Sequence, residues 1–437
     1  MENAPQVAEP RVFGLEGHAR EFFRDELGFL ERTARLGDVV RLRFYHKRVW
    51  LLSHPSLIES IFGLRGSLRK PLSMRTPIQR RLFGAGPLTA DGEPWRAQRA
   101  HAQPALERLG HTAPVIAAAT ERQLASWRDD EVRDVHAALQ ELALRVVAGA
   151  LLGLERDVDL EVVRALTVEV RALHAERSRS RVAWGLDSFL PTIRHRSLVA
   201  RIDRLDQLVN ERVEASRRGS PTTDVLARLV AQPSSPGQLR DQIVTLLLAG
   251  FETVALAVGW ALELLARHPT EQRSLQAESD RVLSTSAPSD EQVASLDLTR
   301  RVLSEALRLY PPNRSTARET TDDLAVGGLR FRRGDQLLLS QWIVHRDGRF
   351  FADPLRFDPA RWTADRARAL PRYAFFPFGG GARACPGRSF AIREATLILA
   401  MIARRFSVAP VAGRPAKPEP RILLYPASGI WLRLSKR

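Results

Sequence analysis

The chain of 437 residues contains a single cysteine, Cys385, inside a segment that reads FPFGGGARACPGRSF from Phe376 to Phe390. The pattern that follows predicts a helix beginning at Pro386, directly after the cysteine. A helix N-terminus offers partial positive charge and free N–H groups, and both lower the pKa of a nearby thiol. A cysteine deprotonated in this way has the chemistry of an iron ligand.

The residues around the cysteine are of types that suit a bound flat macrocycle. Gly381 and Gly387 permit positive φ angles and let the backbone approach such a group closely. Arg383 can neutralise an acidic substituent of the group, and Phe378 can shield the sulfur from water. The alternative interpretation is a glycine-rich turn that carries a buried, inert cysteine before a helix.

A second segment, Ala249-Gly250-Phe251-Glu252-Thr253, lies in the middle of the longest predicted helix. Gly250 leaves room for a small molecule such as dioxygen, and Thr253 can donate to the carbonyl of Ala249 or turn towards that molecule. Glu252 can supply protons to a reaction. The alternatives are a threonine satisfied by its own backbone and a buried glutamate paired with an arginine.

The spacing F-x-x-G-x-R-x-C-x-G around Cys385 resembles the haem-binding signature of the cytochrome P450 superfamily. The segment at Ala249 resembles the (A/G)-G-x-(D/E)-T motif of the same family, with glutamate in place of the commoner aspartate. The resemblance covers nearly the whole chain and implies haem b (iron protoporphyrin IX) with Cys385 as the axial iron ligand. Further cofactor-binding residues that it implies are Phe378, Gly381, Arg383, Gly387, Ala249 and Gly250. It also implies a catalytic role for Glu252 and Thr253.

Three other motifs match the family residue by residue. Trp95 and Arg99 match the W-x-x-x-R of a helix that contacts the haem propionates, and Arg318 matches another propionate-binding arginine. Glu305 and Arg308 match E-x-x-R, and Pro359-Ala360-Arg361-Trp362 matches P-x-R-(F/W). The resemblance implies a structural cluster of Glu305, Arg308 and Arg361 behind the haem. Taken singly, each arginine has the alternative of a solvated surface charge.

The resemblance implies a monooxygenase that inserts one atom of O2 into a lipophilic small molecule, such as a terpenoid, a steroid or a fatty acid. Electrons would come from a separate ferredoxin and an NAD(P)H-dependent reductase. We expect the positive charge of the chain to serve an acidic partner of this kind, and four arginines are candidates for its docking face: Arg96, Arg372, Arg388 and Arg393.

Two alternative functions stay open at this point. The first keeps the fold but changes the chemistry, to a peroxide-driven peroxygenase, an isomerase or a dehydratase. The second is a haem protein that senses or carries electrons without turnover. The first class typically lacks the acid–alcohol pair that Glu252 and Thr253 form here.

Composition restricts the partners and the compartment. The formal charge is +16, but the excess is almost all arginine, is spread along the chain and includes no nucleic-acid-binding motif, so we expect no nucleic acid partner. One cysteine excludes an intrachain disulfide and any CxxC motif. No signal peptide or membrane anchor is expected, and the longest apolar runs are shorter than a membrane span. These features predict a cytoplasmic monomer.

Hydrophobic periodicity predicts a mainly α protein with a small β part, arranged as a single domain over 1–437. The resemblance implies that this is the cytochrome P450 fold, with the long central helix passing over the haem. Helices are predicted at 17–36, 55–62, 93–103, 112–128, 132–152, 160–177, 193–218, 222–230, 233–268, 270–283, 298–309 and 386–405. Strands are predicted at 39–44, 48–52, 324–326, 329–331 and 336–340, with a terminal hairpin of 421–425 and 430–434.

The substrate pocket is expected to be lined by four segments: 68–88, 160–201, 246–253 and 313–317. Its stretch of the long helix is apolar, which favours a lipophilic guest. Four arginines in or near these segments are candidates for holding a substrate carboxylate: Arg75, Arg80, Arg81 and Arg314.

Overall fold

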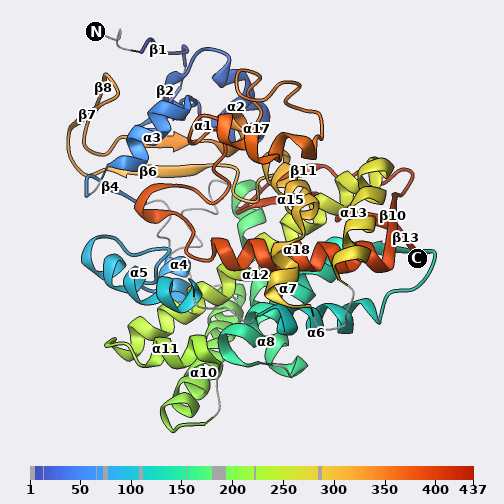
Figure 1. The fold of residues 1–437 in the computed structure, drawn as a ribbon. Helices are drawn as coiled ribbons and strands as arrows, with labels where there is room; N and C mark the ends of the chain where they lie inside the picture. Colours follow the sequence, from blue (N-terminus) through green and yellow to red (C-terminus); the bar gives the residue numbers. More distant parts are fainter. Residues whose placement is uncertain are drawn as a thin grey trace. The chain divides into compact units, whose positions relative to one another are not determined.

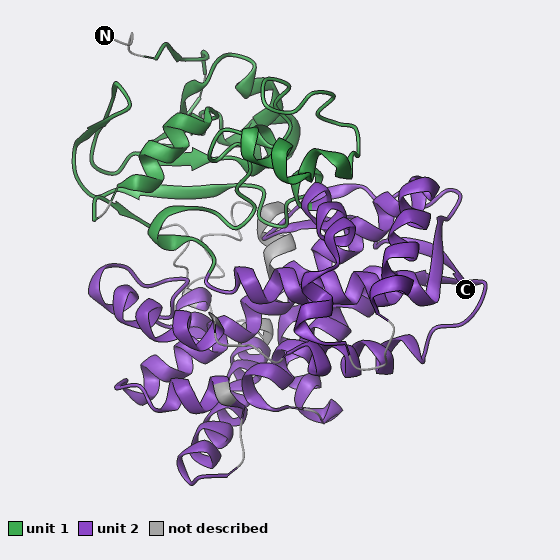
Figure 2. Ribbon diagram, viewed as in Figure 1, with its two compact units in different colours: residues 1–74, 307–385 green, residues 75–306, 386–437 purple. Residues whose placement is uncertain are grey.

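The computed structural model describes residues 5–12, 14–64, 66–71, 77–107, 112–154, 156–179, 193–220, 223–283 and 288–437. The chain divides into two compact units, each made of two separate stretches of sequence. Unit 1 comprises Met1–Met74 and Leu307–Cys385, and unit 2 comprises Arg75–Ala306 and Pro386–Arg437 (Figure 2). The expectation of a single domain over the whole chain stays a prediction.

Unit 1 is built on a six-stranded mixed sheet in the order β1-β2-β3-β9-β6-β4 (Figure 1). Its strands are β1 Val7–Ala8, β2 Val39–Phe44, β3 Lys47–Leu52, β9 Gln336–Leu339, β6 Thr316–Thr320 and β4 Leu68–Arg69. The predicted pair β2 and β3 forms an antiparallel hairpin, β3 pairs with β9 in parallel, and β9 pairs with β6 antiparallel. A smaller hairpin joins β7 Leu324–Val326 to β8 Leu329–Phe331, as predicted.

The helices of unit 1 are short. They are α1 Ala19–Arg24, α2 Glu26–Ala34, α3 Pro55–Gly63, α16 Gln341–Val344, α17 Ala364–Ala369 and the 3₁₀ turns η2 Pro359–Trp362 and η3 Gly381–Arg383. The single helix predicted over 17–36 is wrong, because Asp25 leaves the helical region at φ −150° and its carboxylate caps the backbone N–H of Gly28. The apolar core of the unit includes Trp50, Ile58 and Phe376.

Unit 2 is mainly helical, and its long helix α12 Pro236–Arg267 makes extensive contacts with α7 Val135–Leu152 and α18 Arg388–Arg405. A capping box of Ser235 and Gln238 begins α12, and the helix ends before Pro269. The other helices are α4 Pro77–Phe83, α5 Gly92–Glu107, α6 Ala113–Leu124, α8 Asp157–Arg179, α10 Ile193–Arg217, α11 Asp224–Val230, α13 Pro269–Val282, α14 Asp290–Ala294 and α15 Asp297–Leu309. The last three residues of α15 belong to unit 1.

Two small sheets complete unit 2. Strand β13 Trp431–Lys436 lies between β10 Phe406–Pro410 and β5 Glu131–Asp134, and β11 Pro418–Pro420 pairs with β12 Leu424–Pro426. The predicted terminal hairpin is therefore wrong, since its two strands belong to different sheets. The predicted helix over 132–152 also begins too early, because its first residues extend β5 and pair with β13.

Two predicted helix limits near proline differ from the structure. Helix α5 continues through Pro104 to Glu107. Pro104 and Ala100 are both exposed, so water can satisfy the carbonyl of Ala100 that proline leaves without a helical partner. Helix α18 begins at Arg388 instead of Pro386, with Gly387 as its N-cap residue.

Two helices, α7 and α12, are long and apolar enough to span a membrane. Among the described residues, the apolar stretches of both helices are mostly buried inside the protein. Burial of this kind is the property of a core helix, and the sequence predicted it for α12 from its apolar composition on nearly all faces.

Candidate functional site

The cysteine loop of unit 1 is folded against α3 and leaves the thiol exposed. The backbone N–H of Cys385 donates to the carbonyl of Phe378 at 2.9 Å, which closes the loop. Gly381 has φ +63°, and a Cβ atom there would lie 2.2 Å from the carbonyl oxygen of Phe62 in α3. Only glycine fits this position, so the predicted close approach at Gly381 is to the chain's own backbone.

His345 anchors the chain that leads into this loop. It is fully buried, and its Nε2 accepts from the backbone N–H of Phe376 at 3.0 Å. Burial, with Arg346 and Arg308 nearby, holds the pKa of His345 well below its ordinary value. The ring is therefore neutral and acts as a fixed acceptor, a role that the sequence did not identify.

Three cations of unit 1 gather at one place. Burial and the neighbouring Arg383 lower the pKa of Arg318, which is 6% exposed, to about 10. Burial, Arg318 and Arg383 lower the pKa of Lys70 to about 7. Cations that repel one another in a partly desolvated place form a site for anions. The carboxylates of haem propionates fit this charge, as the resemblance implies for Arg318 and Arg383.

Lys70 was not among the residues selected from the sequence. Two features of the sequence could have indicated it. Lys70 is one of only four lysines in the chain, and it begins the Pro/Gly/Arg-rich segment after β4. The neighbouring Arg69 does not take part in this anion site, because it binds the buried carboxylate of Glu319 at 2.5 Å. Lys70 therefore joins Arg318 and Arg383 in what we call the cation cluster.

Helix α12 of unit 2 is buried along its central part except for one stripe. Between Gln242 and Ala266 the residues that are not buried are Leu246, Leu248, Ala249, Gly250 and Thr253. Residues spaced by three or four lie on the same helix face, so Leu246, Ala249 and Thr253 form an open stripe. The only hydroxyl on it, that of Thr253, donates to the carbonyl of Ala249 at 3.5 Å.

The side chain of Glu252 does not belong to this stripe. It is 5% exposed, its Oε1 accepts from the amide of Gln140 in α7 at 3.1 Å, and its Oε2 accepts from the hydroxyl of Tyr425 in β12. Glu252 and Thr253 are thus neighbours in sequence with different surroundings.

Gly250 makes its close approach to another helix. A Cβ atom at this position would lie 3.0 Å from Cγ1 of Val147 in α7. Gly250 therefore lets α12 pack closely on α7, and the room for dioxygen expected at this residue stays a prediction. Trp95 and Arg99 lie one turn apart on α5 and are both partly buried, and Arg99 donates from Nε to the amide oxygen of Gln103 at 2.9 Å.

The predicted structural cluster is buried around α15. Glu305 and Arg308 are both fully buried. The guanidinium of Arg308 donates to the carbonyls of His345, Pro354 and Arg356, and that of Arg361 donates to the carbonyl of Asp353. Arg308 and Arg361 therefore both contact the irregular stretch of unit 1 between α16 and η2. The cluster of these two arginines with Glu305 stays a prediction.

Several arginines proposed for substrate or partner binding already have acidic neighbours. Arg314 binds Glu26 through two bonds of 2.7 Å, and Arg81 binds Asp203 and Asp206. Arg80 is exposed, and Arg75 lies outside the described residues. Among the docking candidates, Arg96 pairs with Glu93, Arg372 with Glu59 and Arg393 with Asp290, while Arg388 is exposed at the start of α18.

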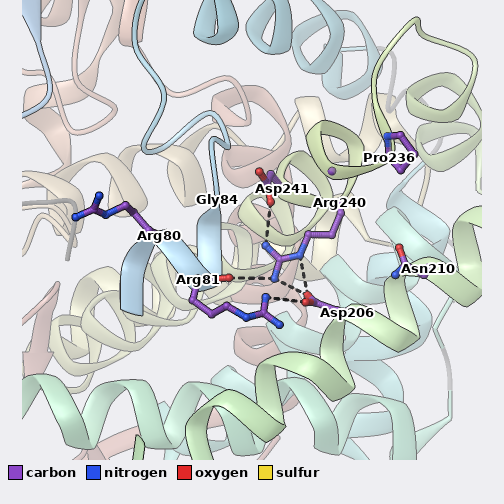
Figure 3. Close-up of a pocket in the computed structure, with 9 residues that line it drawn as sticks. Arg80, Arg81, Gly84, Asp206, Asn210, Pro236, Arg240 and Asp241 are labelled. Carbon is purple, nitrogen blue, oxygen red and sulfur yellow. Dashed lines mark hydrogen bonds and ion pairs between the residues drawn. The ribbon is translucent and has the colours of Figure 1, made fainter. Parts of the chain in front are cut away.

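A surface depression of about 370 Å³ in unit 2 is separate from the stripe on α12. It lies at the N-terminal end of α12, where Arg240 binds Asp206 and Asp241 and where Arg81 also reaches Asp206 (Figure 3). Four of the charged groups that line it, those of Arg81, Asp206, Arg240 and Asp241, are paired with one another. The depression therefore reflects an ion-pair network that joins α4, α10 and α12, with no sign of an apolar pocket.

The predicted cofactor residues fall into two groups, one in each unit. Unit 1 holds Phe378, Gly381, Arg383, Cys385 and Arg318, and unit 2 holds Trp95, Arg99, Ala249, Gly250, Glu252, Thr253 and Gly387. The local geometry of each group fits a haem: an accessible thiol on a closed loop, a cluster of cations, and an open apolar stripe with one hydroxyl.

Comparison with known proteins identifies the family. The family model described as Cytochrome P450 matches residues 26–433. Cyclooctatin synthase of Streptomyces melanosporofaciens is 34% identical over 95% of this chain and 92% of its own length. Cyclooctat-9-en-7-ol 5-monooxygenase of the same organism is 32% identical over 92% of this chain and 90% of its own length. Pentalenene oxygenase of Streptomyces avermitilis is 30% identical over 98% of this chain and 97% of its own length.

The fold agrees with this assignment. The crystal structure of a mutant cytochrome P450DA haem domain superimposes with a TM-score of 0.86 at 24% identity, covering 99% of this chain and 98% of that one. The predicted fold class is thereby confirmed. Family and relatives also support oxygenase chemistry over the isomerase, electron-carrier and sensor alternatives. The chain belongs to the cytochrome P450 family and is a haem-b-dependent monooxygenase.

Proposed function

We propose that Cys385 is the thiolate ligand of the haem and that the enzyme oxidises an uncharged terpenoid with electrons from a separate ferredoxin. When bound, the haem supplies the activation of dioxygen, and electron donation by the thiolate favours cleavage of the O–O bond. The protein contributes binding, orientation, exclusion of water and delivery of protons.

Each group of residues has one of these tasks. The cation cluster of Lys70, Arg318 and Arg383 would hold the propionates, with Arg99 and Trp95 contributing from α5. Closure of the cysteine loop through the Cys385 N–H and the Phe378 carbonyl fixes the sulfur. The hydroxyl of Thr253 would orient and pass protons on the open stripe, and Glu252 would be the acid that supplies them.

The open stripe of α12 is the observation that supports the substrate class. The residues that it presents are Leu246, Ala249 and Thr253, with no charged group. The arginines Arg81 and Arg314 already bind acidic side chains and are therefore poor candidates for holding a substrate carboxylate. The names of the relatives describe an unsaturated hydrocarbon and an unsaturated alcohol as substrates, and such molecules match an apolar stripe.

A binding titration tests the substrate class. The haem spin state is followed while holoenzyme is titrated with a cyclic terpenoid alcohol, a cyclic terpenoid hydrocarbon and a fatty acid of equal carbon number. We expect the terpenoids to shift the spectrum and the fatty acid to do so only weakly. Ala249→Phe should abolish the terpenoid shift by filling the stripe. Tight binding of the fatty acid alone would overturn the proposal.

The carbon-monoxide complex tests the ligand separately. We expect the reduced protein with carbon monoxide to show the strongly red-shifted Soret band of a thiolate complex. Cys385→His should lose this band while the protein still binds haem, and Ala249→Phe should keep it. An unchanged band in Cys385→His would remove Cys385 from the role of ligand.

The proposal also covers the redox partner, the compartment and the oligomeric state. A ferredoxin reduced by an NAD(P)H-dependent reductase would supply the electrons, because its acidic surface complements a chain with a formal charge of +16. We also propose that the enzyme works as a cytoplasmic monomer. Activity with peroxide alone, undiminished in Thr253→Ala, would instead favour a peroxygenase.

A further inference from the structure

The carboxylate of Glu252 is held by two side chains from other elements of unit 2. Gln140 of α7 donates to one oxygen at 3.1 Å, and Tyr425 of β12 donates to the other. Glu252 and Tyr425 are each 5% exposed, so the hydrogen bond between them lies in a desolvated place, while the one from Gln140 is partly buried. A hydrogen bond to a buried carboxylate is stronger than one in water.

The direction in which these hydrogen bonds turn the carboxylate of Glu252 matters for the proposed chemistry. Successive residues of an α-helix point about 100° apart, so Glu252 and the open stripe at Thr253 face different neighbours. Gly250, two residues earlier, packs against Val147 of α7, and Gln140 lies on that same helix. The carboxylate therefore points towards α7 and β12 and away from the stripe.

The element that carries Tyr425 is itself fixed to α12. The indole N–H of Trp260, two turns after Glu252, donates to the carbonyl of Leu424 at 3.4 Å. His136, one turn before Gln140, has its ring 6.2 Å from that of Tyr425 in an edge-to-face arrangement and is 6% exposed. His136 and Tyr425 are thus the titratable groups that the described contacts place beside the carboxylate.

We propose that Tyr425 and Gln140 are positioning residues that hold Glu252 behind α12 and thereby control when it delivers a proton towards Thr253. This inference rests on the proposed role of Glu252 as the proton source. Only hydrogen bonds form and break in the holding step. Loss of the hold removes the hydrogen bonds from Gln140 and Tyr425 and changes both the protonation and the orientation of the carboxyl group.

The first test reads the carboxyl group directly. The infrared band of protonated Glu252, identified by its disappearance in Glu252→Gln, is titrated with pH in the holoenzyme. Because Tyr425 donates to the charged form, Tyr425→Phe should move the midpoint up by about one to two pH units. Tyr45→Phe is the matched control, since it makes the same chemical change at an exposed tyrosine of unit 1. An unmoved midpoint in Tyr425→Phe overturns the proposal.

The second test reads proton delivery as the fraction of electrons recovered in product instead of hydrogen peroxide. We expect Tyr425→Phe and Gln140→Leu each to lower this fraction two-fold or more, and Tyr45→Phe to leave it unchanged. In the Glu252→Gln background neither substitution should have a further effect. An equal further loss in that background would show that Tyr425 acts by another route and overturn its role as a positioning residue.

The two tests separate the inference from the function on which it rests. If Glu252→Gln itself leaves the product fraction unchanged, Glu252 is not the proton source, and control of delivery by Tyr425 fails with it. The infrared titration would still decide whether Tyr425 holds the carboxylate. If Cys385→His keeps the thiolate spectrum, the proposed ligand fails while both results on Glu252 stand.

Discussion

At the scale of single residues, Glu394 of α18 contrasts with the other buried acids. It is fully buried, and neither carboxylate oxygen has a hydrogen-bond partner among the described residues. Glu278 is also buried, but its carboxylate accepts from the backbone of Leu298 and Thr299. Burial alone raises the pKa of Glu394 well above its ordinary value, so the folded protein keeps this group protonated.

This protonation predicts a stability that depends on pH. Above the ordinary pKa near 4.5 the unfolded chain loses the proton of Glu394 and the folded chain keeps it, so Glu394 lowers stability as pH rises towards its folded pKa. Glu394→Gln cannot ionise. Its advantage over wild type should therefore grow between pH 5 and pH 7, by at most about 1.4 kcal/mol per pH unit.

Urea unfolding at both pH values measures this advantage. Glu214→Gln makes the same chemical change on the exposed face of α10, where Glu214 pairs with Arg217, and serves as the control. It should change the free energy of unfolding little at either pH. A difference between Glu394→Gln and wild type that is equal at pH 5 and pH 7 would contradict the prediction.

Lys70 predicts that haem binding takes up a proton. Burial and its two arginine neighbours hold its pKa at about 7 in the haem-free chain, and a propionate beside it would raise that pKa again. The affinity for haem should therefore fall as pH rises from 7 to 9, and this dependence should weaken in Lys70→Met. Calorimetry in two buffers of different ionisation enthalpy counts the protons taken up.

The control for Lys70 is another lysine with the same substitution. Lys417 is exposed in the segment before β11, so Lys417→Met should keep the proton uptake of the wild type. Proton uptake that is the same in Lys70→Met and wild type would place Lys70 outside the propionate site.

At the scale of elements, one aspartate joins three pieces of unit 2. The carboxylate of Asp134 ends β5, caps α7 by accepting from the backbone N–H of His136 and Ala137, and accepts from the N–H of Ile430 just before β13. A Cβ atom at the neighbouring Gly429, which has φ +82°, would lie 2.4 Å from this carboxylate. The start of α7 and the turn into β13 therefore depend on the same side chain.

Asp134→Ala should destabilise the fold more than the loss of an ordinary cap does. Ser235→Ala removes the exposed cap of α12 and should lower the free energy of unfolding by about 1 kcal/mol. Asp134→Ala also leaves the Ile430 N–H without its acceptor, so we expect a loss larger by roughly 1 kcal/mol. Denaturant unfolding of both variants measures the difference, and equal losses would refute the joining role of Asp134.

Elements with a strong local signal were predicted from the sequence, and those made by distant partners were not. Apolar residues on nearly every face predicted the buried helix α12, and alternation predicted β2 and β3. Strand β6 was missed because it is defined by its pairing with β9 in the sheet and has little pattern of its own. The terminal hairpin was wrong because β13 pairs with β5, about 300 residues earlier in the sequence. Local periodicity contains no information about such partners.

The candidate site follows the same rule. The residues of the cysteine loop and the α12 motif were found because their spacing is local. Lys70, His345, Gln140 and Tyr425 were missed because their importance arises from contacts with residues far away in sequence. The same holds for Gly250, whose tight contact is with Val147 on another helix.

At the scale of the whole molecule, the basic side chains outnumber the acidic side chains with which they can pair. The formal charge is +16, and many arginines, such as Arg96 beside Glu93, pair with acids on their own surface. Arg388 is exposed at the first turn of α18, the helix that follows the cysteine loop. Helices α5 and α18 pack against each other, so Arg96 and Arg388 belong to neighbouring elements of unit 2.

Charge reversal at Arg388 should weaken electron transfer from an acidic ferredoxin. Rim charges change association rates more than they change bound geometry, so Arg388→Glu should raise the ferredoxin concentration for half-maximal rate by about two- to five-fold at low salt. Screening shortens the reach of charges to about 10 Å at 0.1 M salt, so the difference from wild type should shrink towards 0.5 M. Arg217→Glu, on the exposed face of α10, is the control and should change the rate little. A difference between Arg388→Glu and wild type that persists unchanged at high salt would show that Arg388 does not act through long-range charge.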